Sequence, residues 1–293
     1  KVLSKIPLFG RPISAFLRRS KSKIKNLVYK NTLFDCFGFT YIGPIDGHDI
    51  PELENALSAA KKINSPVLLH VVTKKGKGYL PAEENPGTFH GIGKFDIDSG
   101  EPISSHKGFS AEFGNTLCEL AEKDKKICAI TAAMAKGTGL EKFSIYHKER
   151  FFDVGIAEEH AVTFACGLAS KGMRPVFAVY STFLQRSYDQ IIHDAAMSGL
   201  HIVLAIDRAG IVGDDGETHQ GVFDVSMLNS IPNVTIFSPT YFDGLKCALN
   251  SAIYVCNNVA AVRYPRGGEL YKPDDFGEES ITYDVYGNKD CGK

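Results

Sequence analysis

The sequence predicts an α/β fold, with a mostly parallel sheet that carries helices on both faces. Three observations predict it: short apolar runs recur along the chain, amphipathic helical patterns separate most of them, and 44% of the 293 residues are hydrophobic. A chain of this length and composition can bury a substantial core, which excludes disorder as its main state. The 28 glycines and 13 prolines show no period, so collagen-like and low-complexity architectures are excluded as well.

The first block of strand and helix patterns is short. We expect a strand at 39–42 that ends in a turn at 44–47. Asp49 is the expected N-cap of the next helix, because Glu52 follows it at the spacing of a capping box. The run at 66–73 (PVLLHVVT) has the nearly continuous apolar character of a buried parallel strand.

The second block is longer and alternates regularly. It is expected to open with a helix near 109–120, which has one apolar face. Six strands are predicted to follow, most of them separated by helical segments: 127–131, 151–157, 175–180, 202–207, 234–238 and 260–263. Because ligands of such sheets bind beyond the carboxyl ends of the strands, the loops at those ends are the first candidates for a site.

Charge is distributed unevenly along the chain, although its net value is only −1. Residues 1–30 carry nine lysines or arginines and no acidic residue, so the remainder is acidic on balance. A basic leader can be a nucleic-acid arm, a membrane-surface helix, a targeting peptide, or a solvated helix and loop that pack on the domain. We favour the last, and we expect neither a nucleic-acid nor a membrane partner, because the rest is acidic and no apolar run approaches the ~20 residues of a membrane span.

Several familiar signatures are absent from the sequence. The seven cysteines include no CxxC pair, which argues against a disulfide framework or a zinc site and favours a reducing compartment. The chain also lacks the P-loop pattern, HExxH, the G-x-S-x-G elbow and a G-x-G-x-x-G that opens a helix. P-loop nucleotidases and the common hydrolase classes are therefore disfavoured.

The first loop rich in functional groups runs from Asp153 to His160, where a strand leads into a helix. Glu158 falls in the first helical turn, and the helix dipole favours its ionised form there. In the alternative interpretation, Glu158 is only a helix-start carboxylate, and the segment adds no more than a charged pair at the surface.

The second such loop begins at Tyr180 and brings an aromatic ring, hydroxyl groups and the guanidinium of Arg186 to the next strand end. The alternative here is a helix that simply packs Phe183 and Leu184 into the core. From this segment alone, that structural alternative is preferred.

The third loop, 207–221, is rich in glycine and carries Arg208, Asp215 and His219. It is too long and too polar for a simple crossover, and loops of this kind on a rigid sheet commonly carry function. Arg208 and Arg266, which lies in a later YPRG segment, would suit a phosphate group because a guanidinium offers a planar fork of donors. Either arginine taken alone could equally form a surface ion pair.

The irregular stretch between the two blocks adds a weak signal. Lys75 lies in a lysine–glycine turn after a strand, which could cradle an anion, but basic turns are common. His90 is a lone histidine among glycines and is expected to be a solvent-exposed loop residue.

Taken in order, these loops resemble the 1-deoxy-D-xylulose-5-phosphate synthase family, a thiamine-diphosphate-dependent branch of the transketolase superfamily. The runs that carry the resemblance are YIGPIDGHD (41–49), TKKGKGY (73–79), TFHGIGKFD (88–96), FDVGIAEEHAVTFACGLA (152–169), YSTFLQRSYDQ (180–190), AIDRAGIVGDDGETHQG (205–221) and VRYPRG (262–267). They cover almost the whole chain. The segment around Glu158 alone would indicate only the transketolase superfamily. The loop at 205–221 and the YPRG segment restrict the resemblance to the synthase family.

The resemblance implies a role for each candidate residue. Glu158 would hydrogen-bond N1′ of the cofactor's aminopyrimidine, and Glu159 would not. Other residues implied in cofactor binding are Lys75, Tyr79, Ile156, Phe183 and Arg186. Residues implied in binding the phosphate-bearing acceptor are Tyr180, Arg208 and Arg266. Residues implied in orienting carbonyls and hydroxyls, or in moving protons, are His90, Asp215 and His219, the last two also as substrate ligands.

The resemblance also implies a reaction and its partners. Pyruvate would lose CO2 and be joined to D-glyceraldehyde 3-phosphate, giving 1-deoxy-D-xylulose 5-phosphate, with thiamine diphosphate and Mg²⁺ as cofactors. It further implies a transferase that works as a homodimer in a bacterial cytoplasm, or in a plastid stroma.

One departure from the family pattern is serious. The GDG…N motif, whose Asp and Asn bind Mg²⁺ in the family, is absent, so no metal ligand is expected within this sequence. We therefore expect a piece of a longer protein that is inactive alone. The expected parts are the end of the diphosphate-binding domain (1–80), a linker (81–106), the pyrimidine-binding transketolase-like domain (107–270), and a linker toward a C-terminal domain (271–293).

Two other functions stay open from the sequence. A transketolase, or the β-subunit of a 2-oxo-acid dehydrogenase, would share the glutamate after the strand but differ in its acceptor. A non-catalytic binding module would retain the fold alone, although the joint presence of Glu158, Asp215, His219 and both arginines argues against a decayed site.

Overall fold

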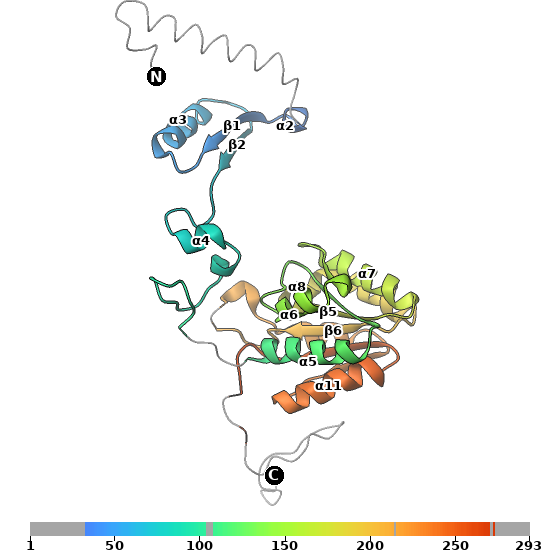
Figure 1. The fold of residues 1–293 in the computed structure, drawn as a ribbon. Coiled ribbons are helices and arrows are strands. Elements are labelled where there is room, and N and C mark those ends of the chain that lie inside the picture. The colour runs from blue at the N-terminus through green and yellow to red at the C-terminus, as the bar shows by residue number, and fades with distance from the viewer. Residues whose placement is uncertain (1–32, 104–107, 214, 270–271, 273–293) are drawn as a thin grey trace, which may run out of the picture. The chain divides into compact units, whose positions relative to one another are not determined.

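The computed structural model describes residues 33–103, 108–213, 215–269 and 272 (Figure 1). The chain divides into two compact units, Lys1–Ser104 and Ser105–Lys293, and each is described by itself. The expectation about the basic segment 1–30, and the one about a linker at 271–293, lie outside the described residues apart from Lys272.

The first unit contains a small parallel sheet. Its described elements are α2 (Leu33–Cys36), β1 (Thr40–Asp46), α3 (Ile50–Ala60), β2 (Val67–Val72), α4 (Leu80–Glu84) and η2 (Thr88–His90). The predicted N-cap of α3 is confirmed, because the Asp49 side chain accepts a hydrogen bond from the backbone N–H of Glu52 at 3.0 Å. The predicted turn at 44–47 is wrong, since residues 44–46 continue β1 past an irregularity between Ile42 and Ile45.

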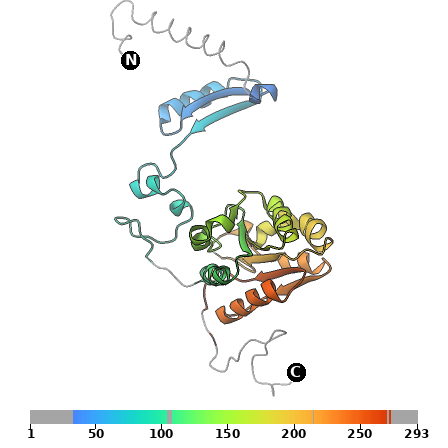
Figure 2. The same cartoon turned by 45° about the vertical axis from the view of Figure 1, so that its right-hand side comes forward.

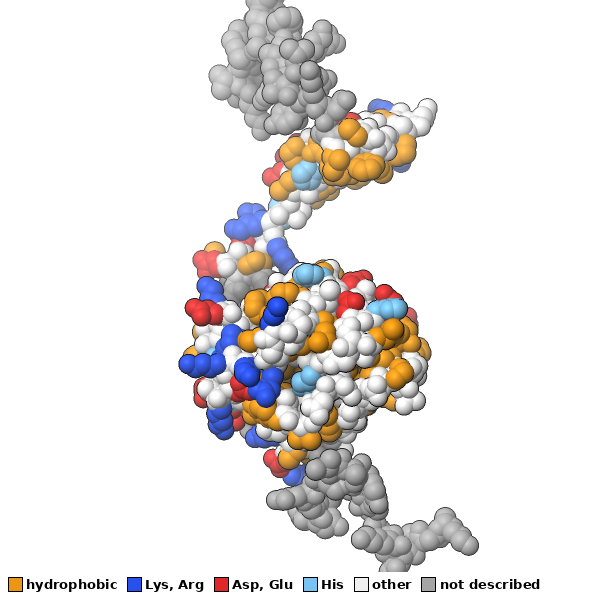
Figure 3. All heavy atoms as spheres, turned by 90° about the vertical axis from the view of Figure 1, so that its right-hand side faces the viewer, with side chains coloured by type: hydrophobic (Ala, Val, Ile, Leu, Met, Phe, Trp, Pro, Cys, Tyr) orange, Lys and Arg blue, Asp and Glu red, His pale blue; other side chains and the backbone are white. Residues whose placement is uncertain are grey.

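The prediction that 66–73 forms a buried strand is only half right. The strand is present as β2, parallel to β1, but Val71 and Val72 are exposed. The physical reason is that this sheet has two strands and packs against α3, with only the four-residue α2 in addition at β1, so the described residues do not cover all of its apolar side chains. Figure 3 shows hydrophobic side chains at the surface of this unit.

The second unit is built on a six-stranded parallel sheet with the order β4-β3-β5-β6-β8-β7. Its strands are β3 (Ile127–Thr131), β4 (Phe151–Asp153), β5 (Arg174–Tyr180), β6 (Val203–Asp207), β7 (Val234–Phe237) and β8 (Val259–Arg263). All neighbours pair in parallel, as predicted. The strand predicted at 151–157 ends earlier than expected, at Asp153, because the chain turns there.

Helices cover both faces of this sheet, which confirms the predicted α/β class (Figures 1 and 2). One layer packs Phe113, Phe143 and Leu249 onto the sheet and consists of α5 (Phe109–Lys123), α6 (Glu141–Tyr146) and α11 (Phe242–Tyr254). The other layer packs Val162 and Leu184 onto the opposite face. Its elements are α7 (Glu158–Ser170), α8 (Ser181–Leu184), η4 (Gln185–Ser187), α9 (Tyr188–Gln190), η5 (Ile191–Ala196) and α10 (Asp224–Asn229).

The topology defines where a ligand would bind this unit. β3 and β5 are neighbours, but the chain leaves β3 toward β4 on one side and leaves β5 toward β6 on the other. Such a switch point opens a crevice at the carboxyl ends of the two strands. The three loops singled out in the sequence follow β4, β5 and β6, so all of them begin at this edge.

In the described parts of the chain, no helix is long and apolar enough to span a bilayer.

Candidate functional site

The turn between β4 and α7 brings a carboxylate into the protein. Gly155 has φ +73°, a conformation that favours glycine, and Asp153 Oδ1 accepts hydrogen bonds from the backbone N–H groups of Gly155 (3.0 Å) and Ala133 (2.8 Å). Asp153 thereby ties the turn after β4 to the turn after β3. Glu158 follows as the first residue of α7.

Glu158 is almost completely buried, with 2% of its surface exposed, whereas Glu159 beside it is exposed. A buried carboxylate is costly unless it is paired. Here Arg186 donates from its NH1 to Glu158 Oε1 at 2.6 Å, and the position at the start of a 13-residue helix adds the favourable dipole. The alternative in which Glu158 is only a carboxylate at the protein surface is therefore wrong.

Aromatic side chains adjoin this ion pair. The guanidinium carbon of Arg186 lies 4.8 Å from the centre of the Phe183 ring. Phe183 stacks on Tyr180, with ring centres 5.8 Å apart, and meets the ring of His219 edge-on at 5.4 Å. Phe183 is half-buried against the core of the unit, so the structural alternative for this loop is partly correct as well.

A second set of charges lies beyond Tyr180. The guanidinium of Arg208 covers the Tyr180 ring at 3.7 Å and donates to Asp215 Oδ2 from Nε at 3.0 Å. Arg266, from the loop after β8, donates to Asp215 Oδ1 at 2.6 Å. One carboxylate therefore bridges the two arginines that sequence analysis associated with phosphate, and Arg208 is not an isolated surface ion pair.

Asp207 is a functional candidate that sequence analysis missed. It ends β6, is fully buried, and accepts a hydrogen bond from Arg208 NH1 at 3.2 Å with Oδ1. Burial raises the pKa of Asp207 to about 6, although the nearby Arg208 opposes this shift. The signal in the sequence was an acidic residue that directly ends an apolar strand.

Two tyrosines near Asp207 also titrate abnormally. Burial raises the pKa of Tyr180, and the fully buried Tyr264 has a pKa well above the ordinary range for the same reason. Both phenols are therefore protonated, neutral groups near neutral pH.

The remaining predicted residues are less closely tied to this cluster. Ile156 is 82% exposed on the turn before Glu158. Three others belong to the first unit: Lys75 Nζ lies 2.7 Å from His90 Nδ1, and the Tyr79 hydroxyl donates to the carbonyl of Ile97 at 2.9 Å. His90 is exposed, as expected.

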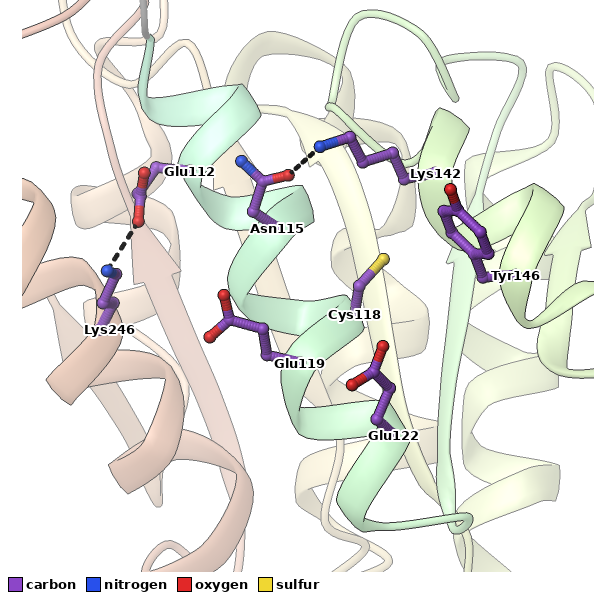
Figure 4. A pocket seen from close by; sticks show the side chains of 8 residues that line it. All are labelled: Glu112, Asn115, Cys118, Glu119, Glu122, Lys142, Tyr146 and Lys246. Atoms are coloured by element: carbon purple, nitrogen blue, oxygen red, sulfur yellow. Dashed lines mark hydrogen bonds and ion pairs between the residues drawn. The ribbon is translucent and has the colours of Figure 1, made fainter.

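A hollow of about 450 Å³ lies elsewhere, over α5, α6 and α11 (Figure 4). Two lysines that line it form polar contacts with other lining residues. Lys246 Nζ lies 3.0 Å from Glu112 Oε1, and Lys142 Nζ donates a hydrogen bond to Asn115 Oδ1 at 2.7 Å. None of the predicted site residues lines it, so it is separate from the cluster at the carboxyl edge.

The fold agrees with the comparison of the chain with known families. The family model described as "Transketolase, pyrimidine binding domain" matches residues 107–269, and the chain belongs to this family. A second model, described as "1-deoxy-D-xylulose-5-phosphate synthase", matches residues 1–73.

Curated relatives confirm the resemblance to 1-deoxy-D-xylulose-5-phosphate synthases that the sequence motifs indicated. The 1-deoxy-D-xylulose-5-phosphate synthase of Clostridium kluyveri is 54% identical over 268 residues, which are 91% of this chain and 43% of that protein. The synthase of Clostridium acetobutylicum is 55% identical over 260 residues, 88% of this chain and 42% of that protein. The chain thus spans less than half the length of these relatives.

Solved structures support the same fold. A chain described as "Split gene transketolase, inactive beta4 tetramer" has a TM-score of 0.50 and 25% identity, over 58% of this chain and 56% of that one. The transketolase of Campylobacter jejuni has a TM-score of 0.51 and 19% identity, over 86% of this chain and 51% of that one, and shows likeness of fold alone.

Proposed function

We propose that this chain supplies the pyrimidine-binding side of the active site of a 1-deoxy-D-xylulose-5-phosphate synthase. The reaction is the decarboxylation of pyruvate and its condensation with D-glyceraldehyde 3-phosphate. The observation that carries the proposal is the buried carboxylate of Glu158 at the carboxyl edge of the sheet, which is bonded to Arg186, whose guanidinium lies over the Phe183 ring. The similarity to synthases at 54% identity supports it.

The residues at this edge fit the pyrimidine end of thiamine diphosphate. The ring needs a carboxyl group that can share a proton with a weakly basic nitrogen, and a flat apolar surface; Glu158 and Phe183 offer these. Arg186, Ile156, Lys75 and Tyr79 are the further residues proposed to hold the cofactor. When bound, the cofactor would supply the electron sink that the loss of CO2 requires.

The other side chains would handle the acceptor substrate. Arg208 and Arg266 suit the phosphate group, because charge-assisted bonds from guanidinium are short and directional. The neutral phenol of Tyr180 and the imidazole of His219 would orient the sugar, and Asp215 lies between the arginines. His90 is proposed as a further group that orients the substrate or moves protons.

Other parts of the proposal concern the metal, the assembly and the location. Among the described residues, no group of three or more His, Cys, Asp or Glu side chains could hold a metal ion. We therefore propose Mg²⁺ as a cofactor but assign none of these residues as its ligand. A homodimer and a cytoplasmic or plastid location are proposed from the synthase resemblance. The division into the four parts given above is proposed on the same ground.

A chimera tests the function directly. In it, this chain replaces the aligned 268 residues of the Clostridium kluyveri synthase. We expect the chimera to form 1-deoxy-D-xylulose 5-phosphate from pyruvate and D-glyceraldehyde 3-phosphate. Glu158→Gln should lower kcat at least ~100-fold, the order expected when a general acid–base group is removed, and Glu159→Gln should leave it nearly unchanged.

The same chimera separates the competing functions. Transfer of a two-carbon ketol unit from a ketose phosphate would favour a transketolase, and acyl transfer to a lipoyl group would favour a dehydrogenase subunit. A folded chimera with none of these activities would favour a non-catalytic binding module.

A further inference from the structure

The short turn η6 (Glu217–His219) places the imidazole of His219 beside the aromatic side chains at the end of β5. The ring is half-buried, and its centre lies 5.4 Å from that of Phe183 and 6.4 Å from that of Tyr180. Contacts between rings do not decide which imidazole nitrogen carries the proton. The hydrogen bond that one nitrogen makes decides whether the other can donate or accept.

The hydroxyl group of Thr218 makes that hydrogen bond. Its Oγ1 lies 3.0 Å from Nδ1 of His219. A hydroxyl can donate or accept, and a neutral imidazole has one nitrogen of each kind. Among the described residues the Thr218 hydroxyl has no other acceptor, so Nδ1 is the acceptor that its proton can reach. When Thr218 donates to Nδ1, the ring proton lies on Nε2, and His219 presents Nε2–H as a donor.

The backbone around His219 is fastened to the start of α8 on both sides. Thr182, in the first turn of that helix, donates from Oγ1 to the carbonyl of Thr218 at 3.1 Å. Gly221 lies directly against Ser181, since a Cβ at position 221 would be 2.7 Å from the Cβ of Ser181. His219 lies between these two contacts in the chain.

The side-chain amide of Gln220 holds the loop together from within. Its Oε1 accepts from the backbone N–H of Val212 at 2.8 Å. Its Nε2 donates to the carbonyls of Val212 at 2.7 Å and Gly216 at 3.0 Å. The backbone on both sides of His219 is therefore fixed before a ligand binds, and the orientation of the imidazole is the freedom that Thr218 removes.

We propose that Thr218 and Thr182 are positioning residues for His219. The Thr218 hydroxyl keeps the proton of the imidazole on Nε2, and Thr182 holds Thr218 in the position that this bond requires. When Nε2–H donates to a ligand, electron density shifts toward Nδ1 and strengthens the bond from Thr218, because linked hydrogen bonds polarise one another. Thr218 thereby supports donation from Nε2. The inference rests on the proposed function only for the ligand that His219 meets.

The first test measures the tautomer of His219 in the full chain without ligand. The chain has nine histidines, so ¹⁵N-histidine labelling is combined with the variant His219→Gln, which identifies the signals of this ring. Long-range ¹H–¹⁵N spectra at about pH 8.5, where a histidine is ordinarily neutral, should show mainly Nε2–H in the wild type. Thr218→Val nearly keeps the shape of the side chain but removes the hydroxyl. It should lower the ratio of Nε2–H to Nδ1–H about fivefold, the equivalent of one hydrogen bond.

Matched variants isolate the hydroxyl. Thr218→Ser keeps it and should hold the ratio within about twofold of the wild type. Thr182→Val should shift the ratio in the same direction as Thr218→Val but less, and Thr235→Val, at an exposed threonine of β7, should leave it unchanged. Thr218→Ala removes the same hydroxyl if Thr218→Val fails to fold. Mainly Nδ1–H in the wild type, or an unchanged ratio in the variants without the hydroxyl, would overturn the inference.

Activity of the chimera gives the second readout. Thr218→Val should lower kcat about fivefold and change the KM of either substrate by less than about twofold, since the bond acts while His219 donates. Thr218→Ser should restore most of kcat. Equal losses of kcat in the two variants would make Thr218 a merely structural residue and contradict the inference. An inactive chimera together with the expected tautomer shift would remove the proposed function and leave the positioning of His219 intact.

Discussion

Arg186 donates to Oε1 of Glu158 across 2.6 Å, and the two side chains differ sharply in exposure, 48% for the arginine and 2% for the glutamate. Arg186 also lies over the ring of Phe183. It therefore connects the buried carboxylate with the aromatic side chain proposed to face the same pyrimidine. In the chain without ligand, this arginine compensates the charge that burial of Glu158 would otherwise leave unpaired.

A double-mutant cycle should measure that compensation. Arg186→Ala should lower the free energy of unfolding by about 1–2 kcal/mol, between the cost of losing an exposed ion pair and that of losing a buried one. Glu158→Gln removes the charge that needs the partner, so Arg186→Ala should cost much less in that background. Urea unfolding of the four chains gives the coupling, and additive effects would mean that the pair contributes nothing to stability.

The carboxylate of Asp153 should control the geometry of the turn that carries Glu158. Asp153→Ala removes one acceptor from two backbone N–H groups, those of Ala133 and Gly155, and should cost about 1–2 kcal/mol because both bonds are made to an exposed charge. Asp153→Asn keeps an oxygen acceptor, so its free energy of unfolding should fall by less than half as much as that of Asp153→Ala. Urea unfolding provides the measurement, and equal losses in the two variants would contradict this role.

Gly137 leaves room for the Tyr180 hydroxyl. A methyl group at position 137 would lie 1.7 Å from that oxygen, so Gly137→Ala must displace the phenol or its own loop, at about 1–3 kcal/mol. The matched control is Gly167→Ala in α7, where nothing lies within 4 Å and the gain in helix propensity should stabilise the chain by about 1 kcal/mol. Thermal unfolding should show a lower Tm than the wild type for Gly137→Ala and a higher Tm for Gly167→Ala.

The sheet of the second unit was predictable because buried parallel strands form continuous apolar runs. β3, β6 and β8 lie within one residue of their predicted positions for this reason. The strand predicted at 151–157 was too long because Val154 and Ile156 continue the apolar run after Asp153 has already turned the chain. In the first unit, the same apolar signal at 66–73 could not indicate how many strands and helices would pack around it.

The site residues were predictable as members of loops at strand ends, but their pairings were not. Glu158 and Arg186 are 28 positions apart, and Asp215 and Arg266 are 51 apart, so only the fold brings them together. The position of Asp207 at the end of an apolar strand is visible in the sequence, but its complete burial depends on tertiary packing. The roles that the resemblance implies for these residues stay predictions.

Asp207 should make the stability of the chain depend on pH in the direction opposite to that of an ordinary salt-bridged carboxylate. Burial raises its pKa from 3.8 to about 6, so between about pH 4 and pH 6 the folded chain holds a proton that the unfolded chain has lost. Raising the pH through this window must therefore lower the free energy of unfolding, by up to about 3 kcal/mol for a shift of two units. Other groups titrate too, so the measurement is the difference in urea stability between the wild type and Asp207→Asn at several pH values. That difference should fall from pH 4 to pH 6 and stay level above pH 7, whereas a rise across the same window would mean that Arg208, not burial, dominates the ionisation of Asp207.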